Sequence, residues 1–434
     1  MKERNSMEVR GPSEHHGAIE AADGASVSVE PATATAFIGL NSPARIVAVD
    51  LARFLAIVGM IATHLLFLPP MNGLVEPIYG FPSTLFALIG GVSAVLSTRR
   101  FATDGQHLAA ALSLVGRGVI VALIGVVLSL PPGLVVVVLV YFGVALICAS
   151  PFLRVPARAL IIVAGALALT GPFLNLAVRA AADLDTIGEL SLAGPFEFLY
   201  SVFFTGTYPV VTWLVYVLVG MAVGKLVLAA TAEGRASRFA IRMTIAGAVM
   251  AAIATLIDAL SRGFVIGQLV DASALSPDLV RTLLVEGFGG PVGSGWVAVV
   301  NATPHTGSVG DIVRTLGVSL VILGVLLLTT QRLSHPLPLM LRPIATAGAA
   351  PLTIYSVHVL ATIMTTIVSM TFFDLSEPEW WFNGLGILGI HIAGVLAIGA
   401  ILAAIRRRGP LETFTTWVAR HCARLGVRWG SPRR

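Results

Sequence analysis

Three ionisable residues share one face of an apolar segment that begins near residue 45. Asp50 and Arg53 differ by about 60° in helical azimuth, and His64 falls between them. The helical rise separates Asp50 from His64 by about 21 Å, so an ion pair would lie near one end of the segment and an imidazole near the other. An imidazole can act as a general base near neutral pH. The alternative is structural: the ion pair anchors a helix end, and His64 bonds a neighbouring carbonyl.

A second polar face runs through residues 351–370. Its polar side chains recur at intervals of three and four: Tyr355, His358, Thr362, Thr365 and Ser369. Hydrogen bonds between membrane helices would explain the hydroxyl groups, but they explain a histidine at mid-membrane depth less well. His391 is isolated in its own apolar segment, and we expect a structural role for it. The two polar faces together predict a hydrated passage between their helices.

The elements that position these residues must be membrane helices. Of the 434 residues, 56% are hydrophobic and 12% are charged, and the mean hydropathy is +0.89. This composition excludes an ordinary soluble domain, in which about a quarter of the residues are charged, and it excludes disorder as the main state. We therefore predict an all-α, polytopic membrane helix bundle. We count ten spans, at 46–68, 80–98, 112–130, 133–150, 159–178, 207–229, 239–258, 311–330, 344–370 and 380–405.

The charge distribution predicts the topology. If both termini are cytoplasmic, 24 of the 28 basic residues fall on the inner side, as the positive-inside rule requires. We therefore expect a multi-pass protein of the cell membrane, N-in and C-in. Residues 1–43 are predicted to be a disordered cytoplasmic tail, 44–408 the membrane domain and 409–434 a basic cytoplasmic tail. The outer segments 179–206 and 259–310 are predicted as long loops, which are often functional.

The residues resemble a known family. Its features here are Asp50-x-x-Arg53 followed by Met60, the segments 81–91, 207–213 and 220–224, and Pro304-His-Thr-Gly-Ser308, Pro351–His358 and Arg408–Glu412. In this order they are similar to the heparan-α-glucosaminide N-acetyltransferase-like and YeiB-type membrane proteins, as found in actinobacteria. The resemblance implies transfer of an acyl group, expected to be acetyl, from cytoplasmic acyl-CoA to a saccharide-like acceptor outside.

The resemblance also suggests roles for residues. Arg53, Arg117 and Arg99 would attract the phosphates of CoA, and Asp50 would hold Arg53 in place. The candidate catalytic residues are His64, His358 and His305, with His305 at the mouth for the acceptor. Tyr355 would donate to the oxyanion, and Thr362 and Ser308 would contact the substrate. An acyl-histidine intermediate and direct transfer are both compatible with these residues.

The expected partners are the lipid bilayer, acyl-CoA as cosubstrate and a saccharide or glycolipid acceptor, with a homodimer as a candidate assembly. We expect no nucleic acid, no metal and no tightly bound cofactor. Two other functions fit the polar faces. One is a transporter or flippase of an envelope lipid or small solute, although the sequence shows no internal repeat. The other is a non-catalytic membrane partner in envelope assembly.

Overall fold

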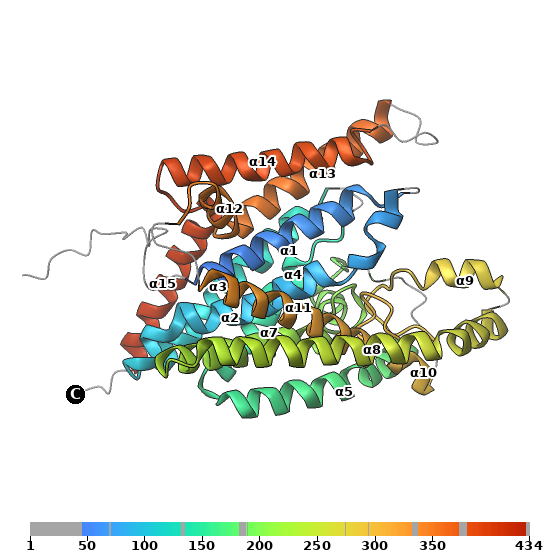
Figure 1. Cartoon of the computed structure of the whole chain (residues 1–434), viewed down its shortest axis with the longest axis horizontal. Coiled ribbons are helices and arrows are strands. Elements are labelled where there is room, and N and C mark those ends of the chain that lie inside the picture. Colours follow the sequence, from blue (N-terminus) through green and yellow to red (C-terminus); the bar gives the residue numbers. More distant parts are fainter. Residues whose placement is uncertain are drawn as a thin grey trace, which may run out of the picture. The chain divides into compact units, whose positions relative to one another are not determined.

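The computed structural model describes residues 46–68, 71–131, 135–181, 188, 190–273, 275–293, 295–331, 337–372 and 380–430, and these residues are helical apart from their connections (Figure 1). The predicted N-terminal tail lies outside the described residues. The principal helices are α1 (Val47–Leu65), α2 (Phe81–Thr103), α3 (His107–Ser129), α4 (Leu139–Ala149), α5 (Ala157–Ala181), α7 (Val210–Ala232), α8 (Ala236–Ser273), α11 (Val309–Thr330), α12 (Leu341–Gly348), α13 (Pro351–Phe372), α14 (Leu385–Ala404) and α15 (Pro410–Gly430). The predicted all-α fold class is confirmed.

Nine helices in the described part of the chain are long and apolar enough to cross a membrane. They are α1, α2 with the short turn before it, α3, α5, α7, α8, α11, α13 and α14. The fourth predicted span, 133–150, is shorter than expected. Its apolar helix covers only Leu139–Arg154, because α4 begins at Leu139; the helix ends in a 3₁₀ turn, η3 (Ser150–Arg154). Nine crossings would put the two termini on opposite sides of the membrane, and a tenth would put them on the same side. The predicted topology, with both termini inside, therefore requires the shorter helix to cross as well, and it stays a prediction.

Two predicted boundaries are wrong for identifiable reasons. We expected a loop after residue 258, but α8 continues to Ser273 and reaches about 57 Å, well beyond a hydrocarbon core of about 30 Å. The sequence offers no proline to end this helix before Pro277. The predicted span 344–370 is divided into α12 and α13, because Pro351 disfavours helical geometry in the residue before it.

Glycines allow the central helices to approach closely. Gly91 on α2 and Gly220 on α7 each face the backbone of the other helix. A Cβ atom at Gly91 would collide with the carbonyl oxygen of Val217, and one at Gly220 would collide with that of Leu88. Gly247 and Gly317 play the same part between α8 and α11. Contacts through small residues are typical of membrane bundles, where close packing replaces the hydrophobic effect.

This close approach predicts a stability effect. Gly220→Val should destabilise the protein by about 1–3 kcal/mol, because the new side chain overlaps backbone atoms that cannot move aside. The matched control is Gly389→Val in α14, where an added Cβ meets no atom within 4 Å. Thermal unfolding in detergent should separate the two variants. Equal unfolding temperatures would contradict the α2–α7 packing.

Candidate active site

The end of α1 and the middle of α13 bring two predicted histidines into contact. Nδ1 of His64 lies 3.0 Å from Nε2 of His358, and the rings are parallel within 1°, with centroids 5.3 Å apart. His358 is almost completely buried. A hydrogen bond between two neutral imidazoles requires one ring to donate and the other to accept. The two residues therefore form a unit whose tautomers are coupled.

Thr362, which was predicted to contact the substrate, indicates which ring donates. Its hydroxyl donates to the backbone oxygen of His358 at 3.0 Å, and the same Oγ1 lies 3.4 Å from Nδ1 of His358. Since the hydroxyl proton is used at the carbonyl, Oγ1 is left to accept from Nδ1–H. Nε2 of His358 must then accept from Nδ1–H of His64. This assignment leaves Nε2 of His64 with its lone pair, and the described residues offer that atom no hydrogen bond.

A third imidazole joins this pair, although we expected it to be isolated. The ring of His391 on α14 stands edge-on to that of His358, with centroids 5.1 Å apart. Its Nδ1 lies 3.1 Å from the Ile387 carbonyl oxygen, and its buried Nε2 has no partner among the described residues. We call His64, His358 and His391 the histidine cluster. Nothing in the spacing of the α14 sequence indicates that His391 faces α13.

The predicted ion pair near the start of α1 is present. Nη1 of Arg53 lies 2.6 Å from Oδ1 of Asp50, and Nη2 donates to the hydroxyl of Ser93 on α2, also at 2.6 Å. Asp50 is buried. The pair therefore fixes the Arg53 guanidinium and joins α1 to α2, in addition to any role with a ligand.

Arg117 completes a group of cations at this end. It lies within electrostatic reach of Arg53, Arg408 and Glu412. The Glu412 carboxylate is already used, because it accepts hydrogen bonds from the backbone nitrogens of Leu352 and Thr353 at the start of α13. In the described part of the chain, no hydrogen bond or ion pair holds the Arg117 guanidinium. A cation inside a membrane helix is costly unless it is paired or functional, so Arg117 is a candidate anion-binding residue.

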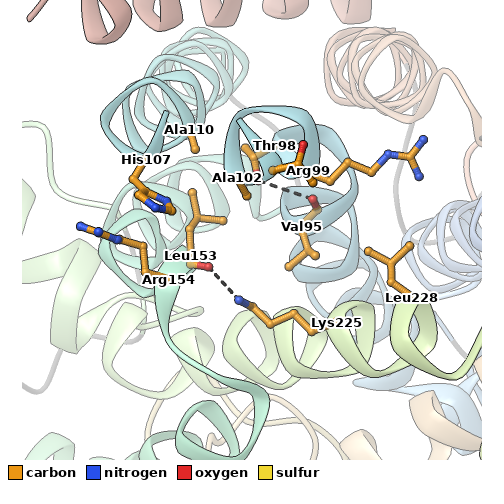
Figure 2. Close-up of a pocket in the computed structure, with 11 residues that line it drawn as sticks. Val95, Thr98, Arg99, Ala102, His107, Ala110, Leu153, Arg154, Lys225 and Leu228 are labelled. Carbon is orange, nitrogen blue, oxygen red and sulfur yellow. Dashed lines mark hydrogen bonds between the residues drawn. The ribbon is translucent and has the colours of Figure 1, made fainter. Parts of the chain in front are cut away.

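Arg99 does not join this group. It lines a separate cavity of about 230 Å³ between α2, α3, η3 and α7, together with other basic side chains from His107, Arg154 and Lys225 (Figure 2). Figure 2 shows Lys225 directed at the Leu153 carbonyl oxygen, to which it donates at 2.7 Å, and the Arg99 guanidinium extending away from the other labelled residues. This volume is below the roughly 300 Å³ of ordinary ligand pockets. The four residues predicted to bind the donor therefore divide into two groups.

His305 lies outside the histidine cluster but close to it. Its side chain is within electrostatic reach of His64, and its ring packs edge-on against that of Tyr208 at 5.4 Å. Nε2 of His305 lies 3.5 Å from Oε1 of Glu286. Backbone bonds from Gly287 and Gly289 to the carbonyls of Pro304 and His305 hold the two loops together. His305 also has a positive φ of 62°, which non-glycine residues rarely adopt.

Burial shifts the pKa values of His305 and Glu286 in opposite directions. Desolvation, followed by the charge of Arg314, lowers the pKa of His305 to about 4, and desolvation raises the pKa of Glu286 to about 7. His305 is therefore neutral near pH 7. Since 41% of the Glu286 side chain is exposed, solvent reduces the shift of that carboxyl. Sequence reasoning missed Glu286, because no motif links it to His305.

The opposite shifts predict opposite effects of pH on stability. Between about pH 4 and 6.5, only the unfolded chain binds a proton at His305, so this residue makes stability rise with pH. Between about pH 4.5 and 7, only the folded protein binds a proton at Glu286, so stability falls as pH rises. From pH 4.5 to 6.5, unfolding temperatures should rise more steeply with pH in Glu286→Gln than in the wild type. In His305→Asn they should rise less steeply or fall. Three parallel curves would contradict the shifts.

The remaining predicted substrate contacts have protein partners. Ser308 caps α11: its hydroxyl oxygen accepts from the Asp311 backbone nitrogen at 3.0 Å, and its proton goes to the Asn301 carbonyl. The Tyr355 hydroxyl accepts from the Val138 nitrogen at 3.3 Å, a bond that does not use the phenolic proton. Direct substrate contacts by Ser308, Thr362 and Tyr355 stay predictions.

The polar face of α1 is not the continuous hydrated passage that we expected. Between Arg53 and His64, the same face carries Ile57, Met60 and Ile61, which are all buried in the hydrophobic core. Two polar sites therefore stand apart in this structure. One is the cation group around Arg53 and Arg117, and the other is the histidine cluster. The helical rise between Arg53 and His64 is about 16 Å.

Comparison with known proteins identifies the N-terminal half of this arrangement. Residues 45–257 match the family described as heparan-alpha-glucosaminide N-acetyltransferase, catalytic. Over these 213 of the 434 residues the chain is similar to that family. The match includes Asp50, Arg53, His64, Arg99 and Arg117, and it ends before His305 and His358. A search of curated proteins found no match.

The match to this catalytic family supports membrane acetyltransferase activity in general, and the nine long apolar helices among the described residues indicate a multi-pass membrane protein. Among the residues that the structure describes, no group of three or more His, Cys, Asp or Glu side chains could hold a metal ion. The described site offers imidazole, hydroxyl and guanidinium groups.

Proposed function

We propose that this protein transfers an acetyl group from cytoplasmic acetyl-CoA to an amine or hydroxyl group of a saccharide-like acceptor on the other side of the membrane. The observation that carries the proposal is the contact of 3.0 Å between Nδ1 of His64 and Nε2 of His358. With His64 as the donor in this contact, its Nε2 keeps the lone pair that would accept a proton. The family match supports the acetyl group and the acceptor class.

The cation group around Arg117 is the proposed site for the phosphates of the donor. The group consists of Arg117 on α3 with Arg53 on α1 and Arg408 in the connection between α14 and α15, which both lie within electrostatic reach of Arg117. The Asp50 carboxylate holds Arg53 in place. Guanidinium groups bind phosphate oxygens through paired, charge-assisted hydrogen bonds. Arg99 is proposed to help at the separate cavity, where it would attract the donor to the same side of the membrane.

The histidine cluster is the proposed site of transfer. His64 takes a proton from the acceptor nitrogen or oxygen as that atom attacks the thioester carbon. The new C–N or C–O bond forms, the C–S bond breaks, and the CoA thiolate leaves and takes up the proton. His358 holds the tautomer and orientation of His64, while the Tyr355 phenol is proposed to donate to the oxyanion. His305 and Glu286 are proposed to receive the acceptor.

The thioester must travel from the cation group to the histidine cluster. The pantetheine arm of the donor is a flexible chain that suits such a distance. Met60 lies on the intervening face of α1, and its unbranched side chain can change rotamer without disturbing the backbone. We therefore propose that donor binding displaces Met60, together with the adjacent side chains of Ile57 and Ile61, and joins the two polar sites.

The test is direct. Purified protein in detergent is incubated with acetyl-CoA that carries a labelled acetyl group, with and without an amino sugar. We expect saturable binding, slow release of labelled acetate without the amino sugar, and labelled acetylated product with it. If the protein neither binds nor turns over acetyl-CoA, while it remains folded by circular dichroism, the proposed function is wrong.

A further inference from the structure

Helix α15 follows the last turn of α14 and packs with one face against the first half of α3 (Figure 1). Cys422 lies over Gly116, and Gly426 lies over Ala109, where any added Cβ would meet atoms of the other helix. Thr415, Ala419 and Ala423 are also buried. This face is therefore fully used in the contact with the bundle.

The opposite face of α15 carries large apolar side chains that the described chain leaves uncovered. Phe414, Trp417 and Leu425 are 47%, 56% and 42% exposed. At 100° per residue they fall within about 80° of one another, so they form one stripe. The rings of Phe414 and Trp417 stack with centroids 6.2 Å apart. In water, this exposed apolar surface would be unfavourable.

Three arginines run obliquely along this face of α15. At 100° per residue, Arg420 and Arg424 lie about 60° and 20° outside the stripe on the side of Trp417, and Arg428 falls within it, as does His421, whose ring centroid lies 4.2 Å from that of Trp417. Arg420, Arg424 and Arg428 recur every four residues, all are exposed, and no acidic residue follows Glu412 on the helix. Like charges at this spacing repel one another in an isolated helix. An external anionic surface would turn that repulsion into attraction, because each guanidinium would then have a phosphate partner.

The position of α15 puts both features at the membrane boundary. α15 begins six residues after the spanning helix α14 ends, and Glu412 in its first turn caps the N-terminus of the spanning helix α13. α15 itself is not among the helices apolar enough to span. An aromatic and aliphatic stripe beside a basic row, on a helix at the end of a bundle, is typical of helices that lie in the interface.

We propose that α15 lies in the membrane surface, with Phe414, Trp417 and Leu425 among the acyl chains and Arg420, Arg424 and Arg428 bound to anionic lipid headgroups. The proposal does not depend on acetyl transfer. Each arginine close to an anionic membrane surface raises the affinity of the helix for that surface about fivefold, so the three arginines together raise it roughly a hundredfold.

The experiment uses the full-length protein in lipid nanodiscs that contain lipids brominated in the acyl chains. One set holds phosphatidylcholine alone and the other adds phosphatidylglycerol. The signal of Trp417 is the difference between the wild type and Trp417→Phe. We expect bromine to quench Trp417 more strongly with phosphatidylglycerol. The triple variant Arg420→Gln, Arg424→Gln, Arg428→Gln should lose that difference.

The matched control is the triple variant Arg235→Gln, Arg238→Gln, Arg242→Gln, which removes the same charge from three exposed positions in the first turns of α8 and immediately before it, where Arg235 pairs with Glu233. It should leave the quenching of Trp417 unchanged. If the α15 variant does not fold, 1 M salt replaces it, because salt screens the headgroup attraction and should remove the effect of phosphatidylglycerol in the wild type.

Three results would overturn the proposal. Quenching of Trp417 by aqueous acrylamide but not by bromine would place α15 in water. Protection from both quenchers would show that another protein surface, such as a second copy of the chain, covers the stripe. Equal bromine quenching in both lipid mixtures, or in wild type and the α15 triple variant, would show that the arginines do not bind anionic headgroups.

Discussion

Replacing His64 by alanine is expected to lower kcat for acetyl transfer by two to four orders of magnitude, the usual contribution of a positioned general base. With Thr362 accepting from His358 and His358 accepting from His64, Nε2 of His64 keeps its lone pair for the acceptor proton. Since the cation group is untouched, KM for acetyl-CoA should change little. Initial rates with labelled acetyl-CoA and an amino sugar measure both constants.

His358 is expected to act through His64 as a positioning residue. His358→Gln should lower kcat less than His64→Ala does, and it should shift the acidic limb of the pH–rate profile, which a purely structural change would not move. The matched control is His421→Ala, which removes an exposed imidazole on α15. Full turnover by folded His64→Ala protein would show that the base has been assigned wrongly.

Replacing Arg117 by glutamine is expected to raise KM for acetyl-CoA about 10- to 100-fold with kcat nearly unchanged. A hydrogen bond to a charged group contributes about 1.5–3 kcal/mol, and the described residues provide no protein partner that would need this guanidinium. The loss of a phosphate contact weakens ground-state and transition-state binding equally. Steady-state kinetics with varied acetyl-CoA measure the effect.

Two comparisons make the Arg117 prediction specific. Arg158→Gln, at an exposed position at the start of α5, should leave KM unchanged. S-acetylpantetheine lacks the phosphates of the donor, so the wild type and Arg117→Gln should use it with the same KM. If Arg117→Gln impairs the two donors equally, Arg117 does not bind a phosphate.

Much of the fold could be predicted because hydrophobic length is the main signal in a membrane protein. Seven of the nine long helices in the described part of the chain match predicted spans to within about five residues at each end. The errors arose where local sequence gave no boundary signal, as along α8, or where a proline divided an apolar run, as at Pro351. The C-terminal segment, described from sequence only as a basic tail, forms helix α15. The apolar and basic faces of α15 follow from the sequence once the residues that form the helix are known.

The site was predictable along single helices and not between them. The spacing within α1 indicated the Asp50–Arg53 pair, which the structure contains. The contact between His64 and His358 joins residues 294 positions apart, and the part played by His391 depends on how α14 packs. The spacing of polar residues along a helix also does not show whether the face that they share contacts water. Ile57, Met60 and Ile61 share the azimuth of the polar residues and are packed in the core.

In the proposed reaction, an acetyl group enters the protein on the side of the cation group and leaves it on the side of His305. Proteoliposomes that enclose an amino sugar, with labelled acetyl-CoA outside, test it most directly once protease digestion shows on which side α15 lies. Labelled amino sugar should form inside only in vesicles whose α15 faces outward, and none should form with His64→Ala. Product in vesicles of the opposite orientation, or acetylation of amino sugar supplied only on the side of acetyl-CoA, would contradict the account.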